Sequence, residues 1–294
     1  MPILALIAIT AIWGVTFVQV KDAVEVYPLF SFLALRFAIA SAALGAPFAR
    51  RLPRLDRRGV VSGVVLGCFV AGGFALQTLG LARTTVTSAG FITGMFVPLT
   101  PVFAMLIFRD RIGWTGWAGT ALATLGLALL SGVELGSLGP DLLVLGGAAS
   151  FALHIVFTSR FAPRYDVAAL ALLQMLVACA VFTAIALASE PLELPRGWTV
   201  WGALIVTGLF ASALAFIVQT WAQSRTTATR TALIFTSEPV FAGLFGFLLA
   251  GDRLTAVAWL GCAWILVGIL VSQPALTDWL NRWRRPSRPA PDLL

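Results

Sequence analysis

The chain has 294 residues, of which 59% are hydrophobic and only 11% are charged, and its formal net charge is +7. Soluble domains carry about 25% charged residues, so this composition excludes an ordinary water-soluble globule. The positive charge does not indicate a nucleic-acid partner, because it is confined to short segments between apolar runs. The three cysteines lie far apart without metal-site or disulfide spacing, so neither a metal nor another cofactor is expected.

Apolar runs of about 17 to 25 residues, the length that crosses a bilayer as a helix, recur along almost the whole sequence. The first begins at Ile3 without a preceding basic segment or a following cleavage pattern, so we expect a span and not a signal peptide. The sequence therefore predicts an all-α integral membrane protein with ten transmembrane helices. We place these helices at about 3–20, 29–49, 60–82, 87–108, 113–131, 141–159, 167–188, 198–222, 230–250 and 254–272.

Basic residues are unevenly divided between the two sets of connecting segments. With a cytoplasmic N-terminus, fifteen fall on the cytoplasmic side and four on the other. Positive residues accumulate in cytoplasmic loops, so this imbalance predicts an even number of spans, both termini in the cytoplasm, and a cell inner membrane as the host. The inner set is Arg50, Arg51, Arg54, Arg57, Arg58, Arg109, Arg111, Arg160, Arg164, Arg225, Arg230, Arg282, Arg284, Arg285 and Arg288, and the outer set is Lys21, Arg83, Arg196 and Arg253.

An internal repeat divides the chain into halves. Gln77–Thr87 recurs as Gln219–Thr229 at an offset of 142 residues, and Phe30–Ala40 more loosely resembles Ala168–Ala178. Shared polar residues make chance similarity of apolar sequence a poor explanation. Further matches at the offset of 142 are Asp110-Arg111 with Asp252-Arg253, Gly119 with Gly261, and Gly126 with Gly268.

The repeat predicts two domains, residues 1–135 and 136–273, followed by a cytoplasmic tail at 274–294 in which Trp279 and Trp283 rest near the headgroups. Each half has five spans, an odd number, so the second half must enter the membrane in the opposite orientation. Inverted repeats of this kind occur in secondary transporters, where substrate sites lie near the midplane between the halves.

The chain resembles the drug/metabolite transporter superfamily, and within it the ten-helix branch with two EamA domains. The resemblance covers residues 3–272. It implies an exporter-like carrier with a central cavity bounded by spans 1, 3, 4, 6, 8 and 9. Both halves have Asp where the family usually has Glu before Arg, and either acid suits a helix N-terminus. The motifs are Trp13-Gly14, Leu35-Arg36-Phe37, Thr87-Ser88-Ala89-Gly90-Phe91, Thr100-Pro101-Val102-Phe103, Asp110-Arg111, Glu238-Pro239-Val240-Phe241 and Gly251-Asp252-Arg253-Leu254-Thr255.

Spans 4 and 9 occupy equivalent places in the two halves and both contain helix breakers. We interpret Gly94, Pro98, Pro101 and Pro239 as hinge residues beside the site, against the alternative of kinks that serve only packing. Small residues also recur every four positions, and we interpret them as faces on which helices pack closely. They are Gly59, Gly63, Gly67 and Ala71 in one span, and Gly119 and Ala123 in another.

Three ionisable residues within the spans are candidates for charge pairing or coupling. Glu238 would face the cavity as a site for an amine or a proton, or accept hydrogen bonds at a helix bend. Arg36 would snorkel to the outer face, or point inward to pair with Glu238 or hold a carboxylate. His154, the single histidine, would contact solute or protons, or bridge two helices.

Neutral polar and aromatic residues complete the predicted solute site. Gln77 and Gln219 occupy equivalent positions and would line the cavity or join helices. Aromatic and sulfur side chains on the central spans would suit an apolar or aromatic solute. The substrate-binding residues predicted from sequence are Trp13, Gln77, Phe91, Met95, Phe151, His154, Gln219, Phe235 and Glu238.

The sequence thus predicts a secondary transporter that exports amino acids or related metabolites by alternating access. Relatives suggest threonine or homoserine, cysteine derivatives and aromatic amino acids as solutes. The alternative is a lipid-headgroup-moving or multidrug-type efflux protein. A membrane-embedded enzyme or a channel is disfavoured, because neither a catalytic residue set nor a filter sequence is present. The expected partners are the solute and the bilayer. The sequence does not determine the oligomeric state, and it is compatible with a monomer.

Overall fold

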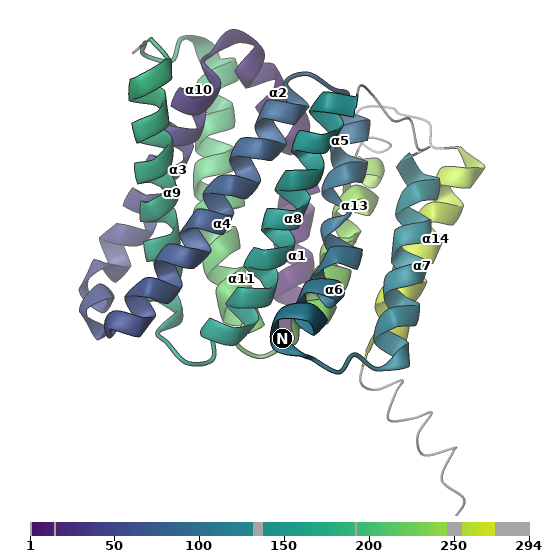
Figure 1. The fold of residues 1–294 in the computed structure, drawn as a ribbon. Coiled ribbons are helices and arrows are strands. Elements are labelled where there is room, and N and C mark those ends of the chain that lie inside the picture. Colours follow the sequence, from purple (N-terminus) through teal and green to yellow (C-terminus); the bar gives the residue numbers. More distant parts are fainter. Residues whose placement is uncertain (1, 15, 132–137, 192, 246–254, 274–294) are drawn as a thin grey trace, which may run out of the picture.

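The computed structural model describes residues 2–14, 16–131, 138–191, 193–245 and 255–273, and these contain helices and no strand. The helices stand side by side in one bundle (Figure 1). They are α1 (Pro2–Gly14), α2 (Thr16–Val26), α3 (Leu29–Phe48), η1 (Ala49–Arg54), α4 (Arg57–Leu81), α5 (Val86–Thr93), α6 (Phe96–Phe108), α7 (Trp114–Ser131), α8 (Leu138–Phe161), α9 (Val167–Ser189), α10 (Gly197–Ile205), η2 (Val206–Leu214), α11 (Ala215–Gln223), α12 (Ala228–Phe235), α13 (Ser237–Phe245) and α14 (Ala256–Val271).

Seven helical segments within the described ranges are long and apolar enough to cross a membrane. They are Pro2–Val26, Leu29–Arg54, Arg57–Leu81, Ser88–Phe108, Leu138–Phe161, Val167–Ser189 and Gly197–Gln223. The other predicted spans correspond to α7, to α12 with α13, and to the shorter apolar helix α14. Residues 246–250 of the predicted ninth span, the motif at 251–254 and the predicted tail at 274–294 lie outside the described residues.

Proline interrupts the two spans in which the sequence predicts a break. A proline ring clashes with the carbonyl four residues earlier and has no N–H to donate. Four residues before Pro98 is Gly94, where the chain leaves α5 and enters α6. Four residues before Pro239 is Phe235, the last residue of α12. Pro101 instead lies inside α6. The interruptions are therefore at matching places, and the hinge role of these residues stays a prediction.

The segment η2 between α10 and α11 is a π-helix, which sequence analysis did not predict. Its small residues lie against α3: a Cβ added to Gly208 would come within 2.8 Å of Ile39. π-Helical turns release backbone groups from the regular ladder and are frequent at functional sites. Here the carbonyl of Ala211 accepts a hydrogen bond from the Trp13 indole at 2.8 Å, which ties η2 to α1.

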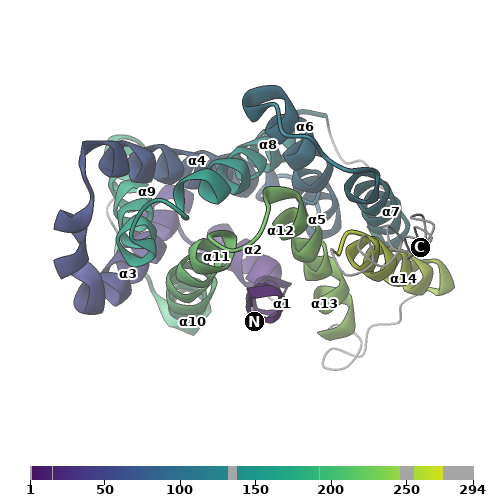
Figure 2. The same cartoon turned by 90° about the horizontal axis from the view of Figure 1, so that it is seen from below.

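Small residues allow close helix crossings where the sequence predicts packing faces. Added Cβ atoms at Gly63 and Gly67 would each lie 2.5 Å from side chains of α9. An added Cβ at Gly119 would lie 2.7 Å from the Gly268 carbonyl, and one at Gly126 would lie 2.6 Å from the Gly261 carbonyl. Helices α7 and α14 therefore touch backbone to backbone, and they stand side by side at one edge of the bundle in both views (Figures 1 and 2).

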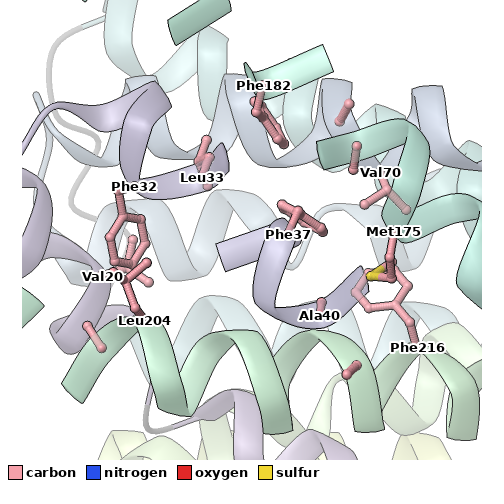
Figure 3. Packing of buried hydrophobic residues seen from close by; sticks show 14 of the residues in the cluster. Val20, Phe32, Leu33, Phe37, Ala40, Val70, Met175, Phe182, Leu204 and Phe216 are labelled. Atoms are coloured by element: carbon pink, nitrogen blue, oxygen red, sulfur yellow. The ribbon is translucent and has the colours of Figure 1, made fainter. Parts of the chain in front are cut away.

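A buried apolar cluster fixes the opposite part of the bundle, where α3, α4, α9 and α10 meet. Phe37 stacks on Phe182 with ring centroids 5.4 Å apart, and Phe32 and Met175 are fully buried in the same cluster (Figure 3). Side chains in these packed helices interlock at van der Waals distance, which is the main attraction between helices in lipid. This cluster holds α3 in place and so positions Arg36.

One end of the bundle, which we call the arginine-rich end, carries the connections 49–56, 109–113, 162–166 and 224–227 and the start of α1 (Figure 1, bottom). The connections 82–85 and, in their described parts, 190–191 and 193–196 lie at the other end (Figure 1, top). Asp166 caps α9 and pairs with Arg51 at 3.4 Å and Arg54 at 3.3 Å. Burial acts to raise the pKa of Asp166, but these partners and the Ala169 amide outweigh it, so the pKa lies below its ordinary value.

Candidate functional site

A cavity lies in the middle of the bundle, between helices from both halves of the chain. Its empty space, counted out to the open mouth, is about 740 Å³, within the range of small-molecule sites. Helices of the predicted spans 1, 3, 4, 6, 8 and 9 bound it, and α3 adds Arg36. The lining residues are Trp13, Thr16, Phe17, Val20, Arg36, Phe74, Gln77, Thr78, Leu81, Thr93, Phe96, Phe151, His154, Ile155, Phe216, Gln219, Phe235 and Glu238.

Most residues predicted to bind solute line this cavity, and two do not. Trp13, Gln77, Phe151, His154, Gln219, Phe235 and Glu238 are lining residues, together with Arg36. Phe91 and Met95 are not, and they pack against the two large apolar clusters instead. The break between α5 and α6 changes the helical register there, so that Thr93 and Phe96 face the cavity.

Fourteen of the eighteen lining residues form equivalent pairs under the sequence repeat. The offset of 142 residues pairs Phe74 with Phe216, Gln77 with Gln219, Thr93 with Phe235, and Phe96 with Glu238. The offset of 138 residues, at which Phe30 aligns with Ala168, pairs Trp13 with Phe151, Thr16 with His154, and Phe17 with Ile155. Both halves thus present the same positions to one cavity, with different side chains at several of them.

A row of aromatic rings crosses the cavity with the same approximate symmetry. Phe74 and Phe216, which are equivalent, lie with ring centroids 6.2 Å apart. Phe74 then contacts Phe151 at 5.2 Å, and Phe216 contacts Trp13 at 6.2 Å. Tilted and edge-to-face rings at these distances attract one another. The row therefore forms a preorganised apolar wall at the contact between the halves.

Arg36 points inward, so the interpretation as a snorkelling residue is wrong. Its side chain is 97% buried, and Nε donates to the Ser212 hydroxyl of η2 at 2.9 Å. The guanidinium lies 4.4 Å from the centroid of the Phe74 ring. This cation–π contact and the hydrogen bond partly replace the hydration that a buried guanidinium loses. Both contacts come from helices, η2 and α4, that meet Arg36 only in the fold.

Glu238 occupies the first turn of α13, directly after the break in span 9, and lines the same cavity. A helix N-terminus carries a partial positive charge that favours a carboxylate. Of the two roles considered for an inward-pointing Arg36, the pair with Glu238 is not formed: the ion pairs among the described residues are Arg51–Asp166, Arg54–Asp166 and Arg160–Asp110. The cavity therefore holds a guanidinium group and a carboxyl group that do not pair with each other directly.

His154 belongs to a directed chain of hydrogen bonds that joins α8, α9 and α11. Gln174 donates to the Leu170 carbonyl at 3.1 Å, which turns its amide oxygen toward His154 Nε2 at 2.7 Å. The ring therefore donates from Nε2, and Nδ1 can accept from Gln219 at 3.5 Å. Both nitrogens of this neutral tautomer have partners, which supports the helix-bridging interpretation while one face of the ring borders the cavity.

Sequence reasoning missed two threonines of the cavity that lie close in sequence to the predicted residues. Thr16 and Thr93 line the cavity, and Thr93 accepts a hydrogen bond from Gln77 at 3.0 Å. The repeat contained a signal for them, because Thr16 aligns with His154 and Thr93 with Phe235. Within the described ranges no three His, Cys, Asp or Glu side chains come together to hold a metal ion.

Comparison with known proteins identifies the family. A model of the EamA-like transporter family matches residues 1–132 and again residues 138–272. The chain belongs to the EamA-like transporter family. The two matches correspond to the two segments that the internal repeat separates, and the family is one of membrane transporters.

Similar proteins match this chain over nearly its full length. An uncharacterized transporter of Archaeoglobus fulgidus is 32% identical over 91% of this chain and 83% of its own length. The uncharacterized inner membrane transporter YedA of Escherichia coli K12 is 26% identical over 97% of this chain and 92% of its own. A solved crystal structure with 20% identity has a TM-score of 0.80 over 95% of this chain and 98% of that chain, which shows a shared fold.

Proposed function

We propose that this EamA-like transporter is a secondary carrier that exports amino acids, above all those with apolar or aromatic side chains, or related metabolites. In this proposal ten transmembrane helices form two inverted five-helix repeats, residues 1–135 and 136–273. The solute binds in the central cavity, to which the two halves give access alternately. The arginine-rich end faces the cytoplasm of a cell with this protein in its inner membrane.

The crossing of α7 and α14 supports the inverted arrangement. These helices are equivalent under the repeat, since Gly119 aligns with Gly261 and Gly126 with Gly268. In the fold Gly119 lies against Gly268 and Gly126 against Gly261. The contact is reciprocal, and position rises along one helix as it falls along the other. An antiparallel contact between equivalent helices is what two halves related by an axis in the membrane plane would produce, and it supports the proposed inverted repeat.

The observation that carries the proposed substrate class is the placement of Arg36 and Glu238 in one aromatic cavity. Arg36 comes from the first half and can bind a carboxylate through its two remaining guanidinium nitrogens. Glu238 comes from the second half and can bind an ammonium group. A zwitterionic amino acid satisfies both charges, and the ring row formed by Trp13, Phe216 and Phe74 suits its side chain.

Uptake into proteoliposomes tests this assignment with three matched probes. L-Phenylalanine carries both charges, phenethylamine lacks the carboxylate, and 3-phenylpropionate lacks the ammonium group. We expect saturable transport of phenylalanine, with at least about tenfold weaker handling of each analogue, because each loses a hydrogen bond to a charged group. Repeating the measurement with and without a pH gradient separates proton coupling from exchange or facilitated movement.

Each other outcome points to a different activity. Equal transport of phenylalanine and phenethylamine would favour efflux of lipophilic cations, for which Glu238 and the rings alone suffice. Movement of labelled lipid without any amino acid would favour a headgroup-moving protein. Absence of transport for a panel of amino acids, in protein that stays folded, would overturn the proposed substrate class.

A further inference from the structure

A second pocket lies at the arginine-rich end, separate from the central cavity. Its empty space is about 1110 Å³ counted out to the open mouth, and it lies between the α6–α7 connection, α8 and the start of α12. Its charged lining residues are Asp110, Arg111, Arg160 and Arg230, and four threonines, at 115, 226, 227 and 229, also line it. Its walls are polar and basic, whereas those of the central cavity are mostly apolar.

The arginines of this pocket are not equivalent. Arg160 forms an ion pair with Asp110, and its guanidinium also lies 4.7 Å from the Phe108 ring centroid. Arg111 and Arg230 form no ion pair with any carboxylate of the described chain. Within the described part of the chain, these two guanidinium groups of the pocket have no carboxylate partner. A guanidinium binds carboxylates through paired hydrogen bonds.

A group of hydrogen-bonded polar residues around Gln223, which we call the Gln223 layer, joins the wall of this pocket to the wall of the central cavity. Gln223 of α11 is fully buried and donates to the Ile155 carbonyl and to the Ser159 hydroxyl of α8, both at 2.8 Å. Ile155 borders the central cavity and Ser159 borders the second pocket. Gln219, which lines the central cavity, donates to the Gln223 amide oxygen at 2.9 Å. A continuous chain of hydrogen bonds thus runs from one space to the other.

The repeat shows that this layer distinguishes one half from the other. The equivalent of Gln223 is Leu81, which lines the central cavity and cannot make side-chain hydrogen bonds. The equivalents of Ser159 and Thr226 are Lys21 and Thr84, and at the opposite end Lys21 donates to the Thr84 carbonyl at 3.0 Å. At the arginine-rich end the corresponding two residues border an open pocket instead.

We propose that this pocket is a second solute site, in which Arg111 and Arg230 hold the carboxylate of an amino acid before it passes the Gln223 layer into the central cavity. The inference rests on the proposed function, because the same solute must fit both sites. It assigns the two sites different chemistry. The second pocket recognises the carboxylate alone, whereas the central cavity recognises both charges.

Equilibrium dialysis of labelled L-phenylalanine against the purified, full-length protein tests this inference. The wild-type protein is expected to bind a second equivalent beyond the one in the central cavity. The double variant Arg111→Gln/Arg230→Gln should lose the second equivalent and keep the first, and Glu238→Gln should lose the first and keep the second. Arg164→Gln is the matched control, because Arg164 lies exposed at the same end outside the pocket. Unlabelled 3-phenylpropionate should displace the second equivalent, and phenethylamine should not.

The possible results separate the two proposals. Binding of a single equivalent that Glu238→Gln abolishes would overturn the second site and leave the proposed function intact. Binding of none, across the amino-acid panel, would overturn both. Loss of the second equivalent in Arg164→Gln as well would show that binding depends on the overall surface charge and not on this pocket, and would overturn the inference. Displacement of it by short-chain phosphatidylglycerol at lower concentration than by 3-phenylpropionate would assign the pocket to lipid headgroups and overturn the inference.

Discussion

Arg36 and Glu238 lie in a largely apolar cavity without forming an ion pair, which is a costly arrangement within a membrane protein. Arg36 recovers part of the cost through Ser212 and the Phe74 ring, and Glu238 through its place at a helix N-terminus. A zwitterionic ligand would supply the missing partners, a carboxylate for Arg36 and an ammonium group for Glu238. At the residue scale, these two side chains therefore define substrate charge.

Neutral variants of the two residues should separate the charges of the substrate. We expect Arg36→Gln to weaken phenylalanine transport about tenfold or more while sparing phenethylamine, because only the carboxylate contact is lost. Glu238→Gln should weaken transport of both amines, with the amount of folded protein unchanged. The ratio of kcat/KM for the two probes measures this, and equal losses for both probes in Arg36→Gln would contradict carboxylate recognition.

A second residue-scale prediction concerns Asp166, which caps α9 and pairs with Arg51 and Arg54. Asp166→Asn keeps much of the cap and loses the charge, whereas Asp166→Ala loses both and should cost about 1 kcal/mol. Because the folded-state pKa lies below its ordinary value, this stabilisation is present above about pH 4 and is lost as pH falls through the lowered pKa. The measurement is the Tm of the wild-type protein and of Asp166→Ala in detergent as a function of pH. A difference in Tm between them that grows toward lower pH would contradict the prediction.

At the element scale, breaks in helices place most of the site. Proline ends α5 and α12 early, so that Thr93, Phe96, Phe235 and Glu238 all meet the cavity near a helix terminus. The π-helix η2 has a different origin and supplies the Ala211 carbonyl and Ser212 hydroxyl. A regular α-helix through η2 would direct the Ala211 carbonyl along the helix axis to a backbone N–H.

The Gln223 layer predicts a change in access between the two spaces. Gln223→Leu, which installs the side chain of the equivalent position, removes two donated bonds that join α11 to α8. In a background without the three cysteines, Ile155→Cys should then react severalfold faster with an impermeant thiol reagent from the arginine-rich end. Thr220→Val is the control, because the Thr220 hydroxyl bonds only within its own helix. Equal reaction rates in both variants would show that the layer does not limit access.

For the whole molecule, the reciprocal glycine contacts of α7 and α14 join the two halves at one edge of the bundle (Figure 2). Gly126→Ala would place a methyl group 2.6 Å from backbone atoms of α14, so the helices must separate. We expect a loss of about 1–3 kcal/mol of stability, seen as a lower Tm. Gly45→Ala is the control, since a Cβ there meets nothing within 4 Å, and an equal fall in its Tm would contradict the packing role.

Orientation in the membrane is a further prediction at this scale. Cysteine placed at Arg54 should react with impermeant reagents only from the cytoplasm, and cysteine at Arg83 only from outside, because these residues lie at opposite ends of the bundle (Figure 1). Labelling of the Arg54 position from outside would reverse the proposed topology.

The sequence by itself determined the membrane-embedded helical class, the repeated halves and the breaks of spans 4 and 9. The length of the apolar runs, the repeated polar segments and the proline positions can each be read directly from the sequence, because they do not depend on tertiary contacts. Only the tertiary structure decided that Arg36 turns inward, that Phe91 and Met95 do not line the cavity, and that Gln223 bonds to Ile155 and Ser159 of α8. Those outcomes depend on helix rotation and on neighbours far apart in the chain. A helix that is apolar on every face does not specify in its sequence which face turns inward.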